Sequence, residues 1–305
     1  MITVVIPLYN KEAFIAETIE SVLRQTREDF ELIVVDDGST DNSIKVVSAF
    51  NDPRLRLIKQ VNAGVSVARN NGIQAATHVW IAFLDADDWW APTFLQEMTN
   101  AIKKFPQNVL FASGRCRVFA SEEERYMHTM LPKDGETNRI NYYHVISKYL
   151  PLINSSNVVI RKSHFENAGY FRPGQKQYED HDLWMRLAIR QNVVFVNNNL
   201  SFYRKTVSGS ASENEYVASD FNTYLQTIIS VKQKLSEQDR RSMNQYASRF
   251  CLLTYLKQYG NYKYEERRLL ENPLKQLISG KYRYLYILSK SVPFNLYKIL
   301  KKLKA

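Results

Sequence analysis

Short apolar runs alternate with amphipathic segments along the first 90 residues of the chain. The runs at residues 2–7, 30–35, 55–58 and 80–84 are rich in β-branched and aromatic residues, which predicts buried strands. Helices are predicted at residues 12–25 and 43–50, and a Gly-flanked loop at residues 62–72 enters a third helix that ends near residue 76. This β-α-β-α-β-α-β order is typical of an α/β fold with a doubly wound, mostly parallel sheet.

The remainder of the chain divides into two regions with different periodicity. Up to residue 212 we expect strands at 155–160 and 193–196, helices at 92–105, 142–150, 162–168 and 183–190, and one long strand or a strand pair at 108–120. The polar residues 121–141 predict a mobile loop. From residue 213, strand signals cease and helical periodicity takes over. We therefore expect two domains, residues 1–212 and a helical region at residues 213–305.

Three aspartates, Asp85, Asp87 and Asp88, directly follow the apolar run at residues 80–84. Carboxylates at the mouth of a buried strand repel one another and are costly to desolvate, and a hard divalent cation would offset that cost. Mg²⁺ and Mn²⁺ take oxygen ligands, usually one or two carboxylates with the phosphates of a substrate. The alternative interpretation is a solvated acidic turn that caps the helix beginning near Pro92.

Polar residues also follow the first two predicted strands, at residues 7–10 and at Asp36 and Asp37. Ligands of a doubly wound sheet bind at the carboxyl ends of its strands. We therefore expect these two clusters and the aspartates at residues 85–88 to converge on one edge of the sheet.

A second acidic cluster, formed by Glu179, Asp180 and Asp182, precedes an amphipathic helix. These acids either complement the dipole at the helix N-terminus or supply a general base near the metal site. His181 is interpreted as a neighbouring polar residue. No Ser or Cys with a paired His is evident, so covalent catalysis has no support.

Composition and charge narrow the function classes. Apolar residues at 45% and charged residues at 24% are ordinary for a globular protein, and no apolar run approaches the length of a membrane span. We see no signal peptide, and two cysteines suit a reducing compartment. The net charge is +10, but eight positive charges follow Glu271, so the first 271 residues carry only +2. The basic tail indicates contact with an anionic surface, and not a nucleic-acid groove across the fold.

Five segments in order resemble the family 2 inverting glycosyltransferases of the GT-A fold, which assemble bacterial surface polysaccharides. The segments are VVIPLYN at residues 4–10, VVDDGSTD at 34–41, NAGVSVARNNG at 62–72, LDADD at 84–88 and EDHDLW at 179–184. Each is weak alone, whereas the five together are highly specific, and they cover about the first 210 residues. The resemblance implies a GT-A catalytic domain at residues 1–212 and a glycosyltransferase activity.

The resemblance also implies a role for each matching position. Tyr9 would stack on or pack beside the nucleotide base, Asp37 would accept a hydrogen bond from a uracil or thymine N3–H, and Arg69 would face the diphosphate. The implied nucleotide-sugar site further includes Pro7, Asn10, Asp36, Asn62, Gly64, Asp85, Ala86 and Asp87. The implied ligands of the metal, Mn²⁺ or Mg²⁺, are Asp85, Asp87 and Asp88. Asp180 would be the catalytic base, supported by Glu179.

In the implied reaction, the metal acts as a Lewis acid on the leaving diphosphate and Asp180 deprotonates an acceptor hydroxyl, so the anomeric configuration inverts. The donor would be a UDP- or dTDP-sugar, and the acceptor a glycan or lipid-linked glycan of polysaccharide, lipopolysaccharide or capsule assembly, bound near residues 110–178. The chain departs from the family at Tyr203-Arg-Lys-Thr206, where many relatives carry Tyr-Arg-x-His. Because Thr206 is a poor metal ligand, carboxylates, diphosphate and water would hold the ion.

Two other functions and two roles for the tail stay open. A nucleotidyltransferase would usually show a Gly-rich loop after the first strand, but the turn here, at residues 8–11, has no glycine. A catalytically idle glycan-binding or scaffold protein of the same fold would not need intact acidic clusters. The amphipathic segment at residues 294–304 either lies on an anionic membrane or docks on the protein's own helices. We expect a cytoplasmic protein, peripheral on the inner face of the cell membrane if the tail binds lipid.

Overall fold

The computed structural model describes residues 1–119, 122–149, 151–205 and 216–289. The chain forms two compact units, Met1–Asn141 with Pro151–Glu213, and Tyr142–Leu150 with Asn214–Ala305. The second unit thus takes in a short segment from the middle of the chain, which the division expected at residue 212 does not include. Thr206 and the tail segment at residues 294–304 lie outside the described residues.

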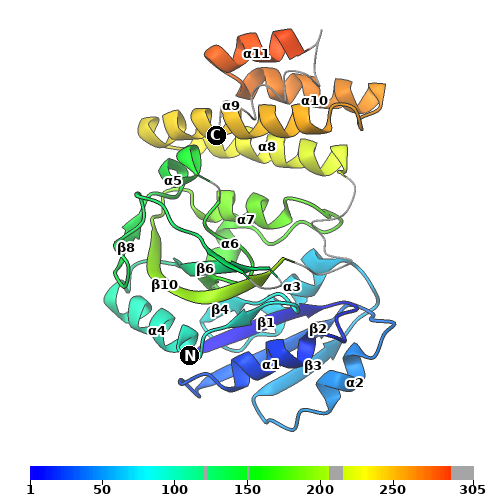
Figure 1. The fold of residues 1–305 in the computed structure, drawn as a ribbon, viewed down its shortest axis with the longest axis vertical. Helices are drawn as coiled ribbons and strands as arrows, with labels where there is room; N and C mark the ends of the chain where they lie inside the picture. The colour runs from blue at the N-terminus through cyan, green and yellow to red at the C-terminus, as the bar shows by residue number, and fades with distance from the viewer. Residues whose placement is uncertain (120–121, 150, 206–215, 290–305) are drawn as a thin grey trace. The chain divides into compact units, whose positions relative to one another are not determined.

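The first unit is built on a sheet of ten strands, ordered β3-β2-β1-β4-β9-β6-β10-β5, with β7 paired to β6 and β8 paired to β10. Figure 1 labels β1 to β4, β6, β8 and β10 of this sheet. Its strands are β1 Ile2–Leu8, β2 Phe30–Asp36, β3 Leu55–Lys59, β4 Trp80–Phe83, β5 Trp89–Trp90, β6 Leu110–Val118, β7 Glu123–Arg125, β8 Thr137–Ile140, β9 Val158–Arg161 and β10 Val193–Arg204. The strands β1 to β4 are parallel, as the βα alternation predicts. Beyond them, β9 is antiparallel to both β4 and β6, whereas β10 runs parallel to β6.

Helices cover both faces of this sheet. On one face, α1 (Ile15–Leu23), α2 (Ser43–Ser48) and α4 (Phe94–Lys104) contribute to the core that contains Val4, Ile6 and Leu32. On the other face lie α3 (Val65–Ala75), α6 (His164–Ala168) and α7 (Glu179–Leu187). Gly72 of α3 approaches β1 so closely that a Cβ there would lie 2.3 Å from the Val5 side chain. The sheet is therefore covered on both sides, which explains why its strands read as nearly continuous apolar runs.

Phe83 anchors the second face. Its ring packs edge-on against Phe165 and Phe171, with centroids 6.2 and 5.4 Å apart, and lies 6.4 Å from the ring of Trp184. Phe165 belongs to α6 and Trp184 to α7. Aromatic contacts of this kind add to the burial of apolar area, so they fix α7 against the end of β4 where the aspartates begin.

Two sequence-based expectations differ from the structure. Residues 121–141, predicted as a mobile loop, contain β7 and β8; both are short and mostly polar, so neither shows the apolar alternation of a half-buried strand. The strand predicted at residues 193–196 continues to Arg204. The register shifts between Val196 and Ser201 mark an irregularity at the polar Asn197–Asn199 run, which hides the continuation in the sequence.

The second unit is helical. It comprises α5 (Tyr142–Lys148), α8 (Ala218–Lys234), α9 (Glu237–Gln258), α10 (Tyr264–Leu277) and α11 (Lys281–Ser289). Arg249 of α9 donates hydrogen bonds to the carbonyls of Ile146, Lys148 and Tyr149, which satisfies the otherwise unpaired C-terminal end of α5. Within the described residues, no helix combines the length and apolar character needed to cross a membrane.

Candidate functional site

The carboxyl ends of β1, β2 and β4 meet at one edge of the sheet because these strands are parallel and adjacent. Tyr9 and Asn10 follow β1, Asp36 ends β2, and Asp85 lies two residues after β4. Pro7 pairs with Val35 of β2, whereas the pairing of β1 with β4 ends at Val5. The missing amide hydrogen of Pro7 therefore removes no hydrogen bond from the β1–β4 pairing. The sequence-predicted residues therefore lie at a common edge.

Asp36 and Asp37 organise the loops at this edge. The buried Asp36 carboxylate accepts hydrogen bonds from the backbone amides of Gly38 and Ser39 at 3.2–3.4 Å. Asp37 is also buried, and its carboxylate accepts bonds from the Gln60 side chain (2.7 Å) and from the amides of residues 63 and 64 (both 2.8 Å). Asp37 thus holds the loop that enters α3.

Neighbouring residues complete this part of the edge. Asn62 donates a side-chain hydrogen bond to the Asp37 carbonyl at 2.9 Å. Gly64 adopts φ 91°, which suits glycine, and forms the N-cap of α3. Asn10, with φ 50°, accepts a bond from the Thr40 amide at 2.8 Å. Tyr9 is 48% exposed, so its ring offers an open apolar surface beside these fixed loops.

Arg69 joins the two acidic clusters. Its side chain is only 4% exposed, and its guanidinium lies 2.8 Å from Asp85 and 3.0 Å from Glu179, which is 110 residues further along the chain. The guanidinium also lies over the Phe171 ring, 5.1 Å from its centroid. Burial opposes its charge, but the surrounding carboxylates raise the pKa of Arg69, so the residue is a buried cation shared between both clusters.

The three aspartates after β4 have different environments. Asp87 forms an ion pair with Lys11 at 2.8 Å and is partly exposed. Asp88 is 1% exposed; one of its oxygens accepts a bond from the Ser156 hydroxyl and the other from the Arg204 amide at 3.0 Å. Asp85 is partly exposed beside Arg69. Ala86, between them, is buried, and its carbonyl accepts a bond from the Thr18 hydroxyl at 3.0 Å.

The raised pKa values of these aspartates favour a bound cation. Burial raises the pKa of Asp88 well above its usual range, and the charges of Asp85 and Asp87 add to the rise. Burial likewise raises the pKa of Asp85. The charge of Arg69 lowers this pKa, whereas the charges of Asp87 and Asp180 raise it further. A cation among these carboxylates would relieve that repulsion, and the donors are oxygens, as Mg²⁺ and Mn²⁺ prefer.

The positions of the three aspartates indicate which of them could bind a metal ion. Among the described residues, no group of three or more His, Cys, Asp and Glu side chains is gathered closely enough to hold a metal ion. Asp88 is 1% exposed, whereas Asp85 and Asp87 are 30% and 16% exposed, so Asp85 and Asp87 fit an ion that also meets a substrate better than Asp88 does. Two carboxylates are enough for an ion that also binds substrate phosphates.

Glu179 and Asp180 form the first turn of α7, whereas the sequence placed them in front of that helix. Burial, followed by the Asp180 charge, raises the pKa of Glu179 to about 7. Asp180 accepts a bond from the His181 amide at 2.6 Å and is 22% exposed, so it can reach a substrate. Asp182 is fully buried against Arg186 at 2.7 Å, which makes it a structural partner.

Three residues of this edge were missed by the sequence reasoning: Lys11, Ser156 and Arg204. Ser156 receives the Asp85 amide at 3.2 Å while it donates to Asp88, so it fixes the turn between the two aspartates. Arg204 donates to the Asp87 carbonyl at 3.1 Å and covers the ring of Trp89 at 4.5 Å. Lys11 and Arg204 belong to segments that the sequence did single out, residues 8–11 and 203–206, but neither side chain was given a role there, and Ser156 carries no local signal.

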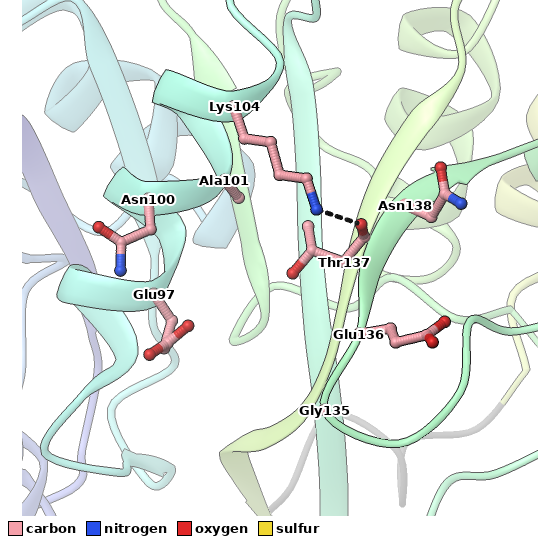
Figure 2. A pocket seen from close by; sticks show the side chains of 8 residues that line it. All are labelled: Glu97, Asn100, Ala101, Lys104, Gly135, Glu136, Thr137 and Asn138. Atoms are coloured by element: carbon pink, nitrogen blue, oxygen red, sulfur yellow. Dashed lines mark hydrogen bonds between the residues drawn. The ribbon is translucent and has the colours of Figure 1, made fainter.

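A separate cavity of about 530 Å³ lies between α4 and residues 135–138 (Figure 2). Its lining is polar, and Lys104 donates a hydrogen bond to the Thr137 carbonyl across it at 3.3 Å. None of the candidate site residues lines it; the lining residues are Glu97, Asn100, Ala101, Lys104, Gly135, Glu136, Thr137 and Asn138. This cavity is therefore distinct from the acidic edge.

Among known structures, the chain is similar to the crystal structure of S. aureus TarS 1–349 in complex with UDP-GlcNAc. The TM-score is 0.75 at 19% sequence identity, over 99% of this chain and 90% of TarS 1–349. This likeness confirms the predicted GT-A fold with a helical C-terminal region.

Curated relatives and a family model give the family. The chain is 26% identical over 226 residues to glycosyltransferase GlyG of Streptococcus pneumoniae, covering 71% of this chain and 74% of GlyG. It is 38% identical over 142 residues to the uncharacterized glycosyltransferase EpsJ of Bacillus subtilis, an alignment that covers 46% of this chain and only 40% of EpsJ. Residues 3–169, more than half of the chain, match the family model for glycosyl transferase family 2. The chain therefore belongs to glycosyl transferase family 2.

Proposed function

We propose that this protein is an inverting glycosyltransferase that moves a sugar from a nucleotide-diphosphate sugar to a hydroxyl of a glycan or lipid-linked acceptor in bacterial surface-polysaccharide assembly. The observation that carries the proposal is the Arg69 bridge between Asp85 and Glu179 at 2.8 and 3.0 Å. It joins the acidic turn after β4 to Glu179, the neighbour of the candidate base Asp180, at the ligand-binding edge of the sheet. A binding protein without chemistry would not need this concentration of like charge.

The donor would bind at the ends of β1 and β2. The exposed ring of Tyr9 offers a stacking surface for the base, and Asp37 can accept a further hydrogen bond from a pyrimidine N3–H. Pro7, Asn10, Asp36, Asn62 and Gly64 would shape this pocket. A UDP- or dTDP-sugar fits these requirements, and the UDP-GlcNAc in the TarS structure supports a nucleotide sugar.

A divalent cation, Mn²⁺ or Mg²⁺, would be held by Asp85 and Asp87 with the donor diphosphate, while Asp88 would fix the turn from its bonds to Ser156 and Arg204. The bound ion would supply Lewis-acid stabilisation of the leaving diphosphate. Lys11, 2.8 Å from Asp87, already places a positive charge at this carboxylate and would face the same phosphates.

Asp180 would act as the general base. It would accept the proton from the acceptor hydroxyl while that oxygen attacks the anomeric carbon from the face opposite the diphosphate, so that the configuration inverts. Glu179, held by Arg69, would fix the first turn of α7 and so the direction of Asp180. Arg69 would act by positioning, because its guanidinium is already engaged by two carboxylates.

The basic C-terminal tail would bring the enzyme to a membrane-bound acceptor. Eight positive charges and no acidic residue follow Glu271. Lys and Arg near an anionic leaflet each contribute about 1 kcal/mol, so this tail would hold a cytoplasmic enzyme at the inner face of the membrane, where lipid-linked glycans lie. Unchanged binding to anionic liposomes after deletion of residues 290–305 would remove this part of the proposal.

The catalytic assignment is tested by comparing Asp180→Asn with His181→Gln. We expect Asp180→Asn to lower sugar transfer by roughly 10²–10⁴-fold with donor affinity within a few-fold, because general-base catalysis contributes about that much. His181→Gln should transfer within a few-fold of the unmodified protein. The donor is found first by a thermal-shift screen of nucleotide sugars with and without Mn²⁺. Full transfer by Asp180→Asn, or loss only in His181→Gln, would overturn the assignment.

A further inference from the structure

Three cationic residues, Arg115, Arg117 and Lys205, lie together on the β6–β10 pair; we call them the basic row. Arg115 and Arg117 are alternate residues of β6, so both side chains point to the same face. They pair in register with Ser201 and Tyr203 of β10. The Lys205 amide donates to the Val118 carbonyl at 2.9 Å, which extends this pairing by one residue.

Within the part of the chain that the structure describes, Arg115 is a buried cation without a carboxylate partner. It is 9% exposed, donates one hydrogen bond to the Pro151 carbonyl at 2.9 Å, and lies 5.0 Å from the centroid of the Tyr126 ring. Its Nε is buried with no hydrogen-bond partner among the described residues, and no carboxylate there forms an ion pair with it. By contrast, the buried Arg69 is paired with two carboxylates. Leaving a buried charge uncompensated is costly, so the position favours a bound anion.

The other two members concentrate positive charge beside it. Among residues 1–119, 122–149, 151–205 and 216–289, Arg117 forms an ion pair only with Glu124, at 3.3 Å. That carboxylate is 61% exposed and therefore weakly held. Burial and then the charges of Arg117 and Arg115 lower the pKa of Lys205. Burial and Arg117 lower the pKa of Arg115, whereas Asp180 acts in the opposite direction. Like charges therefore crowd together. The row adjoins the acidic turn after β4, because the amide of Arg204, the neighbour of Lys205, donates to Asp88 at 3.0 Å.

We propose that the basic row binds a phosphate or phosphodiester group of the acceptor, next to the hydroxyl that Asp180 deprotonates. The guanidinium fork of Arg115 suits phosphate oxygens, and a dianion or monoanion beside it would offset the crowded charges. This inference rests on the proposed function and specifies its acceptor as an anionic glycan or lipid-linked phosphate. The row lies on β6 and β10, whereas the candidate donor residues follow β1, β2 and β4.

The test follows the Nε–Hε signal of Arg115 by ¹⁵N NMR in the full-length protein. The signal is assigned by its loss in Arg115→Lys. Arg161 supplies the matched control, because its Nε is also buried without a partner and its guanidinium lies 5.2 Å from the Trp80 ring, at the opposite end of β4 from Asp85. Inorganic phosphate is titrated first alone and then with UDP or dTDP present at saturation, which occupies the donor site.

We expect phosphate to shift the Arg115 signal in a saturable way with nucleotide present, and to leave Arg161 unmoved. Arg115→Gln should weaken phosphate binding roughly tenfold or more, as loss of a hydrogen bond to a charged group implies, with nucleotide affinity within twofold. A shift caused by nucleotide alone, with none from added phosphate, would assign the row to the donor diphosphate and overturn the proposal. No shift under either condition would overturn it as well. If the unmodified protein binds neither UDP nor dTDP, that result would instead count against the proposed function.

Discussion

Replacing Arg69 with methionine gives a sharp prediction of what holds the acidic edge together. Methionine keeps most of the length of the side chain and removes its charge. Asp85 and Glu179 lie 2.8 and 3.0 Å from the guanidinium, so its removal leaves two neighbouring, partly buried acids without this counter-ion. The resulting cost is that of uncompensated charge, because the apolar contact with Phe171 is largely kept.

The magnitude follows from burial. Arg69 is 4% exposed, and its partners Asp85 and Glu179 are 30% and 15% exposed. Removing one partner of a buried ion pair typically costs about 3–5 kcal/mol, which is a large part of the roughly 5–15 kcal/mol that stabilises a folded protein. The exposed pair Arg241–Glu237 on α9 supplies the control, and Arg241→Met should change stability by less than about 1 kcal/mol.

The assay is urea unfolding of both variants at pH 5.5 and pH 8. Carboxyl groups whose folded pKa lies above the unfolded value stabilise the protein when protonated, and this contribution is lost as the pH rises through the folded pKa. The pKa values of Asp85 and Glu179 are already raised, and Arg69 opposes the rise in both. The deficit of Arg69→Met should therefore be larger at pH 8 than at pH 5.5. A deficit below about 1 kcal/mol, or one that is equal at both pH values, would refute this reasoning.

Further predictions concern single positions. Because the pKa of Glu179 is raised from its ordinary 4.5 to about 7, unfolding free energy should fall by up to about 3 kcal/mol between pH 4.5 and 7, and Glu179→Gln should flatten that pH profile. Gly72→Ala should cost about 1–3 kcal/mol in thermal or urea unfolding, because its Cβ would lie 2.3 Å from a valine of β1, whereas Gly260→Ala, with open space around it, should be nearly neutral. Ser156→Ala should cost about 1–3 kcal/mol and weaken nucleotide binding. Ser155→Ala should do neither, because the Ser155 hydroxyl has no hydrogen-bond partner among the described residues. Equal effects of the two substitutions in either matched pair would contradict the assignment.

The parallel half of the sheet could be predicted because its strands are buried on both faces and separated by amphipathic helices. Val4, Leu32 and Ala82, for example, are fully buried and lie in apolar runs. The polar edge strands β7 and β8 gave no such signal, since their pairing uses backbone groups that every sequence carries. The position of β8 also depends on β10, which lies far along the chain, whereas β7 pairs with β6 directly before it.

The candidate site shows the same limit. The resemblance to known motifs implied site roles for Asp85, Asp87 and Asp180 and a position facing the diphosphate for Arg69. The ion pairs of Arg69 with Asp85 and Glu179 were not predicted. The carboxylates that bind Arg69 lie 16 and 110 residues further along the chain, so no local sequence pattern predicts these two ion pairs. Ser156 was missed for the same reason: its partner Asp88 lies 68 residues earlier.

The central claim is that the acidic groups after β4 and at the start of α7 gather to bind a metal-bridged sugar diphosphate and to activate an acceptor alcohol. A crystal structure with the donor found by thermal shift and Mn²⁺ tests it most directly. We expect the ion at about 2.1 Å from an Asp87 oxygen, and the anomeric carbon between the diphosphate and the Asp180 carboxylate. A nucleotide bound elsewhere, or Asp180 on the same side of the sugar as the diphosphate, would contradict the account.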